Sequence, residues 1–281
     1  MPYQINCLHG TINLQVPQIM GILNITPDSF FDGGKHDSIS RAIEKAIQLK
    51  NDGATIIDIG GQSTRPKATL VAAAEELDRI ATVIEGIRNF DKSIIISVDT
   101  FYSHVAKHAI ALGADIINDV SAGEMDDAMM QTVADLQVPY IMMHMQGTPS
   151  TMQLAPSYSK VSQEVYQYLE NKMIAAKQLG IQQLIIDPGF GFGKTTAHNF
   201  ELFANLEKFQ DLQTPLLVGI SRKGMIYKTL GIQAAAALNG TSALHMAALQ
   251  KGANILRVHD VKEAKEVIIL YNEVEKYNKE V

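Results

Sequence analysis

The chain has 281 residues, of which 46% are hydrophobic and 19% charged, and its net charge is −6 at pH 7. This acidic balance argues against a nucleic-acid-binding protein, which needs a basic stripe on its surface. Cys7 is the only cysteine, so an internal disulfide and a cysteine metal cluster are both excluded. No apolar run approaches the ~20 residues of a membrane span, and no signal peptide is visible. We therefore expect a cytoplasmic protein without a membrane partner.

The chain begins with a segment that predicts a short β-hairpin over residues 1–17. Tyr3–Val16 alternates loosely between apolar and polar residues, with His9 and Gly10 at its centre. Eight short apolar runs of strand length follow, and most are succeeded by a stretch compatible with a helix. The runs are Gln18–Asn24, Thr55–Gly61, Ile94–Thr100, Asp115–Ser121, Pro139–His144, Gln183–Asp187, Pro215–Ser221 and Asn254–Asp260.

Eight such β/α units in about 280 residues match the size and order of a (β/α)8 TIM barrel. No low-complexity tract or linker interrupts the chain, so we predict a single domain over 1–281, with the hairpin at 1–17 and the barrel at 18–281. The helices are expected at about 38–49, 70–89, 102–112, 126–136, 158–179, 199–206, 223–230, 234–250 and 261–279.

Polar residues gather where these predicted strands end. In a TIM barrel the carboxyl ends of the strands carry the catalytic groups, and a core has no use for so many polar side chains there. The sequence therefore predicts a pocket at this end of the barrel. The residues are Asn24, Asp58, Asp99, Asn118, His144, Asp187, Ser221, Arg257 and His259.

The glycine-rich segment Asp187–Thr195 invites comparison with a phosphate-binding loop. That motif needs a glycine where Pro188 stands, so the match fails. The alternating glycines still permit unusual backbone angles and close approach to a flat ligand. A tight turn between strand and helix is the alternative, and Asp187 just before the glycines favours a pocket.

Three strand-end residues, Asp99, Asn118 and Asp187, are expected around one rim. Carboxylates and amides there can pair with the N–H edge of an aminopyrimidine ring. A helix cap is the alternative for Asp99. Two cations, Arg257 and His259, share one face of the last strand because side chains alternate along it.

With Ser221, Lys223 and Arg65, the two cations of the last strand form a candidate anion clamp, although solvated surface charges are the alternative. His144 suits a structural, hydrogen-bonded histidine better than a metal ligand. No zinc motif is present, while Mg²⁺ shared with a phosphate remains open because that ion leans on substrate oxygens.

These segments together resemble the dihydropteroate synthase family, in order and at compatible spacing over about residues 18–262. Any one motif is weak, but eight in order are very specific. The motifs are Gly21–Phe30, Asp58–Pro66, Ser97–Thr100, Ile117–Ser121, His144–Pro149, Asp187–Thr195, Gly219–Lys223 and Arg257–Val261.

The resemblance implies a transferase of folate biosynthesis, a sulfonamide target, that condenses 6-hydroxymethyl-7,8-dihydropterin diphosphate with 4-aminobenzoate to give 7,8-dihydropteroate and pyrophosphate. It also implies a homodimer, and Mg²⁺ held by Asn24 as the metal ligand. The implied catalytic residues are Asp99, Asp187, Lys223, Arg257 and His259. The implied pterin-binding residues are Asp99, Asn118, Met142, Asp187, Gly219, Lys223 and Arg257. The diphosphate would contact Asn24, Thr64, Arg65, Ser221, Arg257 and His259. The 4-aminobenzoate pocket would be lined by Phe30, Pro66, Phe192 and Ser221.

Loss of the diphosphate would leave positive charge on the pterin methylene. The carboxylates of Asp99 and Asp187 could stabilise that charge, while Mg²⁺ and the cations stabilise the leaving oxygens. The arylamine is a weak nucleophile and is expected to attack only after the cation forms. Loops Thr26–Ser38 and Gln62–Thr69 would close over the site and exclude water.

The sequence departs from the family's usual pattern at three positions. Gln62 replaces an acid, Lys67 replaces a glycine, and Ala122 stands where a second glycine is common. Gln62 keeps hydrogen bonding but loses a charge, and Lys67 does not easily adopt a positive φ angle. We expect these changes to affect loop closure or 4-aminobenzoate affinity more than activity.

Three other functions are compatible with parts of the sequence. A pterin-dependent methyltransferase would use a similar barrel but would not need Thr64, Arg65, Arg257 and His259 to hold a diphosphate. A catalytically silent pterin-binding paralogue is supported only by Gln62 and Lys67. A Schiff-base aldolase would use Lys223, but that lysine lies past its strand end among residues that suit anion binding.

Overall fold

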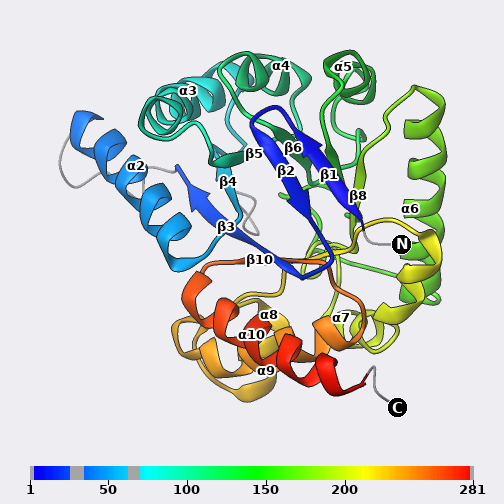
Figure 1. The fold of residues 1–281 in the computed structure, drawn as a ribbon. Helices are drawn as coiled ribbons and strands as arrows, with labels where there is room; N and C mark the ends of the chain where they lie inside the picture. Colours follow the sequence, from blue (N-terminus) through cyan, green and yellow to red (C-terminus); the bar gives the residue numbers. More distant parts are fainter. Residues whose placement is uncertain (1–2, 26–34, 63–69, 279–281) are drawn as a thin grey trace.

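The computed structural model describes residues 3–25, 35–62 and 70–278, and shows eight parallel strands inside a ring of helices (Figure 1). The strand order is β8-β7-β6-β5-β4-β3-β10-β9, and a parallel bridge between Ile186 and Leu216 closes the barrel. The predicted (β/α)8 TIM barrel is confirmed. The strands are β3 (Gln18–Asn24), β4 (Ile56–Gly60), β5 (Ile95–Asp99), β6 (Ile116–Asp119), β7 (Tyr140–Met143), β8 (Leu184–Asp187), β9 (Leu217–Val218) and β10 (Ile255–Val258).

The helices follow the strands as the sequence predicts, including two α-helices between β9 and β10. Several boundaries differ by about three residues. At one of them Asp126 precedes α5, and its Oδ2 accepts the backbone N–H of Ser103 at the start of α4 (2.7 Å). The helices are α2 (Lys35–Asp52), α3 (Ala73–Phe90), α4 (Ser103–Ala111), α5 (Met129–Leu136), α6 (Val161–Gln178), α7 (Thr196–Ala204), η2 (Leu206–Leu212), α8 (Gly224–Leu230), η3 (Ala234–Ala236), α9 (Leu238–Gln250) and α10 (Val261–Asn278). Among these described helices, none combines the length and apolar character needed to cross a bilayer.

Alternate residues of each strand belong to two different layers, because side chains along a strand alternate between its faces. One set, including Ile57, Ile96 and Ile117, packs against the helices in the main core. The other set faces the inside of the barrel. Near its amino-terminal end, each strand contributes one apolar residue to a ring inside the barrel. The ring is made of Met20, Ile56, Ile95, Ile116, Ile141, Ile185, Leu217 and Ile255.

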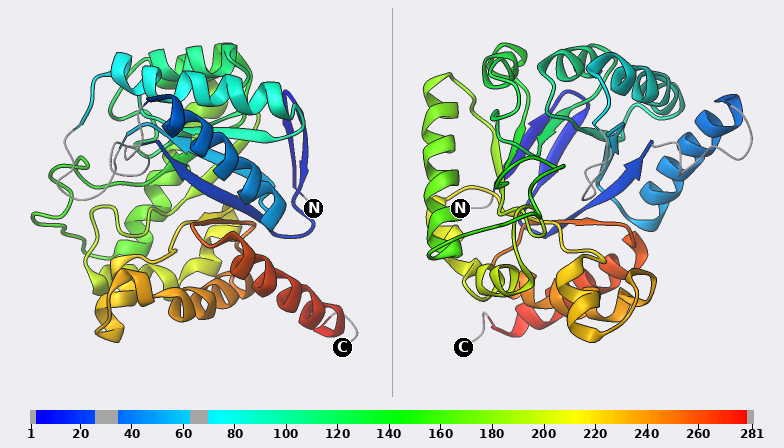
Figure 2. Two further views of the ribbon diagram at one scale, coloured as in Figure 1. Left: turned by 90° about the vertical axis from the view of Figure 1, so that its left-hand side faces the viewer. Right: turned by 180° about the vertical axis from the view of Figure 1, so that it is seen from behind.

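The predicted N-terminal hairpin is present, and it closes this end of the barrel. Its strands β1 (Gln4–Cys7) and β2 (Gly10–Asn13) are antiparallel, and their buried side chains pack on the ring together with Leu14. The hairpin lies at one end of the barrel, and the arrow of β3 points away from it (Figure 2). The carboxyl ends of the parallel strands therefore meet at the opposite end, which we call the barrel mouth.

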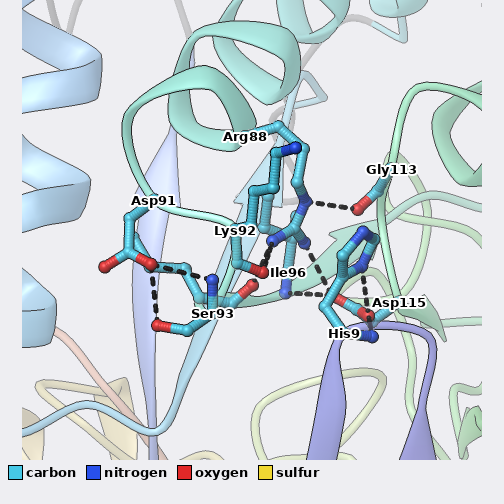
Figure 3. Close-up of polar contacts among 9 residues, drawn as sticks. His9, Arg88, Asp91, Lys92, Ser93, Ile96, Gly113 and Asp115 are labelled. Atoms are coloured by element: carbon cyan, nitrogen blue, oxygen red, sulfur yellow. Dashed lines mark hydrogen bonds and ion pairs between the residues drawn. The ribbon is translucent and has the colours of Figure 1, made fainter.

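A buried ion pair fixes the hairpin end of the barrel, as Figure 3 shows. Asp115 accepts hydrogen bonds from Nη2 of Arg88 (2.7 Å), the backbone N–H of Ile96 (2.9 Å) and the backbone N–H of His9 (2.9 Å). We call these contacts the bottom network. Arg88 also donates to the carbonyls of Gly113 (2.9 Å), Lys92 (2.9 Å) and Ile94 (2.7 Å).

Candidate active site

The barrel mouth holds a second arginine, Arg257, which is half-buried and bridges two buried aspartates. Its Nε donates to Oδ2 of Asp58 and its Nη2 to Oδ2 of Asp99, both at 2.7 Å. The same Asp58 oxygen also accepts Nδ2 of Asn118 (3.1 Å). We call these four side chains the mouth network. Among the described residues, Oδ1 of Asp58 has no hydrogen-bond partner.

Strand register explains why these side chains meet. Asp58 pairs with Ser97 and Asp99 pairs with Asn118 across neighbouring strands, so the polar groups stand at similar heights inside the barrel. Gly60 is paired with Asp99 and has no side chain of its own. A Cβ placed there would lie 3.5 Å from Oδ1 of Asn24 and 3.6 Å from Cβ of Asp99, so this glycine leaves room beside both residues.

One guanidinium serves two buried carboxylates in the mouth network, and the charges are unevenly compensated. Burial would lower the pKa of Arg257, but Asp58 and Asp99 outweigh it and raise that pKa above its ordinary value. Burial raises the pKa of Asp99 to about 7, although Arg257 opposes the shift, and the charge of Asp58 adds to it. The anionic form of Asp99 is therefore destabilised, and a nearby positive charge would stabilise it.

A second group of site residues follows β8 and β9. Nζ of Lys223 donates to the carbonyl of Phe190 (2.5 Å) and lies 4.7 Å from the centre of the Phe192 ring. A Cβ at Gly219 would lie 3.8 Å from Nζ of Lys223 and 3.9 Å from Oδ2 of Asp187, so both charges face this glycine. Burial raises the pKa of Asp187 and lowers that of Lys223 to about 8.

The third group, Ser221 and His259, joins the segments that follow β9 and β10. Oγ of Ser221 lies 3.2 Å from Nδ1 of His259 and accepts the backbone N–H of His259 at 3.3 Å. Burial and then the charge of Arg257 lower the pKa of His259 to about 4. His259 is nevertheless exposed to solvent at the edge of the mouth, where it forms hydrogen bonds with Ser221.

The glycine-rich segment after β8 is a tight turn held by a buried lysine. Gly189 has a φ of +71°, and a Cβ there would lie 1.9 Å from the carbonyl oxygen of His144. Lys194 crosses the turn: its Nζ contacts Nδ1 of His144 (2.8 Å), the carbonyl of Gly189 (2.9 Å) and that of Phe192 (3.1 Å). Burial, followed by Lys194, lowers the pKa of His144 to about 2. These contacts support the structural interpretation of His144.

The structure brings together most of the residues singled out from the sequence. Met142 is an exception: it is packed in the main core, while its neighbour Met143 lies in a cluster with Phe101 and Phe192 near the mouth. Phe30, Thr64, Arg65, Pro66 and Lys67 lie outside the described residues. The residues brought to the mouth are Asn24, Asp99, Asn118, Asp187, Phe192, Gly219, Ser221, Lys223, Arg257 and His259.

Sequence reasoning left two residues of this region without a role. Asp58 had a usable signal, since it stands near the end of a predicted strand, but nothing showed that it would hold Arg257. Lys194 had only the appearance of a failed phosphate motif. Ala122, the departure from glycine, has a φ of +48°, so the backbone keeps the left-handed conformation that glycine adopts more readily.

The described residues of the mouth offer few ligands to a metal ion. The described residues contain no group of three or more His, Cys, Asp or Glu side chains arranged to hold a metal. Asn24 offers one amide oxygen beside Gly60. A single hard oxygen fits Mg²⁺, which usually keeps several waters and binds through substrate phosphates.

Comparisons with known proteins agree with this arrangement. The pterin-binding enzyme family matches residues 20–259. The dihydropteroate synthase of Escherichia coli (strain K12) is 45% identical over 261 residues, which is 92% of each chain. A structure of Xanthomonas albilineans dihydropteroate synthase with 4-aminobenzoic acid aligns with a TM-score of 0.91 at 41% identity, covering 98% of this chain and 99% of that one. Another from the same organism, with 7,8-dihydropteroate, aligns at 0.88 and 38% identity, covering 97% and 99%.

Proposed function

The chain belongs to the dihydropteroate synthases, transferases of folate biosynthesis within the pterin-binding enzyme family, and on that premise we propose how its residues carry out the reaction. The chain condenses 6-hydroxymethyl-7,8-dihydropterin diphosphate with 4-aminobenzoate, and pyrophosphate leaves before the amine attacks. The observation that carries this proposal is the mouth network, in which Asp99 and Asp58 share the single guanidinium of Arg257.

The pterin binds against the buried carboxylates. Asp99, Asn118 and Asp187 offer the acceptors that the N–H edge of an aminopyrimidine needs, and Arg257 lies over the ring. As the diphosphate departs, positive charge develops on the pterin methylene. Asp99 has a raised pKa because burial destabilises its anion. The developing cation and this preorganised carboxylate therefore stabilise each other in the transition state.

The leaving diphosphate binds where β9 and β10 end. Ser221 and His259 offer a hydroxyl and an imidazole, and Arg257 and Lys223 supply positive charge. Asn24 would hold Mg²⁺ together with the diphosphate, and the ion would neutralise charge on the leaving oxygens. From the sequence alone, we also assign Thr64 and Arg65 to the diphosphate site.

The amine arrives over Phe192, whose ring contacts Lys223 at the edge of the mouth. This position supports assigning Phe192 to the 4-aminobenzoate pocket with Ser221, as the sequence does for Phe30 and Pro66. The tether through Lys194 fixes the turn that carries Phe192. A fixed wall limits the orientations of the amine, which increases the rate of attack on a short-lived cation.

We also propose a cytoplasmic homodimer. The lone Cys7 is consistent with a reducing compartment. Leu270, Val274 and Tyr277 recur at helical spacing on α10 and are 61%, 52% and 65% exposed, so they offer an apolar stripe for a second copy. Equilibrium sedimentation should report twice the chain mass, and Val274→Asp should shift it to the mass of one chain.

The reaction itself is tested by incubating the protein with the pterin diphosphate, 4-aminobenzoate and Mg²⁺, and by measuring dihydropteroate and pyrophosphate. We expect both products in equal amounts, and we expect neither when Mg²⁺ is replaced by a chelator. A protein that bound the pterin diphosphate but formed neither product under any condition would be the silent paralogue instead.

A further inference from the structure

The turn that follows β9 contains a strained residue between two site residues. Arg222 stands between Ser221 and Lys223, and its φ is +52°, in the left-handed region that residues other than glycine rarely adopt. The backbone N–H of Lys223 donates to the carbonyl of Ile220 (3.1 Å) and closes the turn. Such a conformation persists only where the surrounding structure enforces it, and it is found often at functional sites.

The surroundings of Arg222 supply this constraint through fixed acceptors. Its Nε and Nη2 form a bidentate ion pair with Asp260, at 2.7 and 2.9 Å. Its Nη1 donates to the carbonyl of Ala234 (3.1 Å) and to that of Ala235. Its backbone N–H donates to Oγ1 of the buried Thr241 (3.1 Å). Both the side chain and the backbone of Arg222 are therefore anchored by residues that do not belong to the proposed active site.

The ion pair runs beside another contact between the same two segments. Ser221 meets His259, and the next residue on each segment, Arg222, meets Asp260. Asp260 also begins α10, because its carbonyl accepts the backbone N–H of Ala264 (3.1 Å). The segment after β9 is thus joined to the segment after β10 by two adjacent links, of which one is formed by site residues and the other is not.

We propose that Arg222 and Asp260 are positioning residues for the leaving diphosphate. The pair holds the turn in its strained form, and this sets Ser221 and Lys223 at a fixed separation from Arg257 and His259. The inference rests on the proposed function, because it takes these four residues as the diphosphate group. It adds a pair that never contacts the substrate and acts only through its neighbours.

The test uses three variants and two binding measurements. Arg222→Lys and Asp260→Asn each remove the bidentate geometry, since a lysine presents a point charge and an amide offers one acceptor. Arg222→Gly removes the pair but suits the positive φ, so this variant should fold well even if the others do not. Calorimetry with pyrophosphate and Mg²⁺ should show a dissociation constant raised between about tenfold and a hundredfold in all three, as expected for displaced groups. The dissociation constant for 6-hydroxymethylpterin should rise far less, because Asp99, Asn118 and Asp187, which bind the pterin, lie outside this turn.

Steady-state kinetics give a second readout that a purely structural role would not produce. The KM for the pterin diphosphate should rise and kcat should fall, while the melting temperature of Arg222→Gly stays near that of the parent chain. Lys251→Gln is a matched control, because Lys251 forms an ion pair with Glu207 in which no site residue takes part and has an ordinary negative φ. This control should change neither pyrophosphate binding nor KM.

The outcomes separate this inference from the proposed function. A parent chain that does not bind pyrophosphate with Mg²⁺ would refute the proposed diphosphate site itself. A parent chain that binds it, with folded variants that bind it equally well, would overturn only the positioning role. Equal losses of pyrophosphate and pterin binding would also overturn it, because they would show a general disturbance of the mouth.

Discussion

At the hairpin end of the barrel Arg88 meets one aspartate, Asp115, and at the mouth Arg257 meets two, Asp58 and Asp99. In the bottom network every oxygen of Asp115 accepts a hydrogen bond, and Arg88 also donates to three backbone carbonyls. In the mouth network the guanidinium is divided between two carboxylates. Oδ1 of Asp58 and Oγ of the neighbouring Ser97 have no partner in the described part of the chain.

The difference between the networks shows two uses of a buried ion pair. A buried charge that loses its partner is costly, so a saturated pair ties together the elements that supply its partners. The bottom network joins the hairpin, α3 and the segment before β6 in this way. The mouth network keeps spare acceptors and a carboxylate of raised pKa. It gives up stability and retains groups that can bind a ligand and stabilise a cation.

The largest expected effect is on stability at the hairpin end. Asp115→Asn removes the charge opposite Arg88 and leaves a buried guanidinium uncompensated, which should lower the free energy of unfolding by about 3–5 kcal/mol. Denaturant titration at pH 7 measures this loss. The kcat of the folded variant should stay unchanged, and a variant as stable as the parent chain would remove the bottom network from its proposed role.

The same substitution at the mouth should act on rate instead. Asp99→Asn keeps part of the hydrogen bonding to Arg257 but cannot offset a developing cation, so kcat should fall by about 10²–10³. Pterin affinity, measured by calorimetry, should change far less than kcat. Asp115→Asn is the matched control, because it makes the same chemical change in the other network. An unchanged kcat in a folded Asp99→Asn enzyme would contradict the account of the mouth.

The shared arginine should matter for the leaving group. Arg257→Ala removes a charged hydrogen-bond donor and should weaken pyrophosphate binding by roughly 1.5–3 kcal/mol, as measured by calorimetry. Lys50→Met, which breaks the ion pair between Lys50 and Asp91 on the outside of the barrel, is the control and should bind pyrophosphate normally. If both variants bound pyrophosphate like the parent chain, Arg257 would not belong to the diphosphate site.

A smaller effect is expected at Gln62, where the family usually has an acid. Its Oε1 accepts the backbone N–H of Val71 (3.0 Å), and its Nε2 lies 3.3 Å from the Val71 carbonyl and 3.4 Å from Oε2 of the buried Glu76. Burial raises the pKa of Glu76 to about 7. A second carboxylate placed here would face both Glu76 and the carbonyl.

Gln62→Glu should therefore lower the free energy of unfolding by roughly 1–2 kcal/mol at pH 8. The loss should shrink as the pH falls below 7, because the folded chain can then hold a proton on one of the two acids. The unfolded chain takes up that proton only at a lower pH. Gln62→Met, which removes the amide without adding charge, is the control and should show no such dependence on pH. A pH-independent loss in Gln62→Glu would mean that Glu76 does not govern this position.

The fold was largely predictable because each strand is a short apolar run ending in a polar residue, and because parallel strands must place those ends together. The site residues at strand ends followed from the same rule. Met142 shows where the rule fails. The run Pro139–His144 is apolar on both faces of its strand, so its alternation cannot be read from the sequence. The structure places Ile141 in the inner ring and Met142 in the main core. An assignment that is wrong by one residue puts every side chain of a strand on the opposite face.

The remaining features depend on contacts between distant segments. Lys194 spans a turn whose shape follows from glycines at positive φ, and Arg222 adopts its strained φ because Asp260, 38 residues away, holds its side chain. Neither residue has a local sequence signal. Sharing of Arg257 by Asp58 and Asp99 likewise requires the closed barrel, since the partners lie 199 and 158 residues apart.

The uneven sharing of Arg257 has a consequence for stability. Because the folded pKa of Asp99 is raised to about 7 from an ordinary aspartate value of about 3.9, the folded chain binds a proton between these values that the unfolded chain has released. Stability should therefore fall as the pH rises from about 4 to 7. Ionised Asp99 is the form that stabilises the cation, so activity should rise over the upper part of the same range.

The most direct test of this account is the titration of Asp99 in the free enzyme. The ¹³C chemical shift of its side-chain carboxyl carbon, assigned by comparison with Asp99→Asn, can be followed by NMR from about pH 3 to 9. The account predicts a midpoint near pH 7, because burial and the charge of Asp58 raise the pKa of Asp99 more than the shared guanidinium of Arg257 lowers it. A midpoint at or below about 3.9, the value of an ordinary aspartate, would show that Arg257 fully compensates both carboxylates and would contradict it.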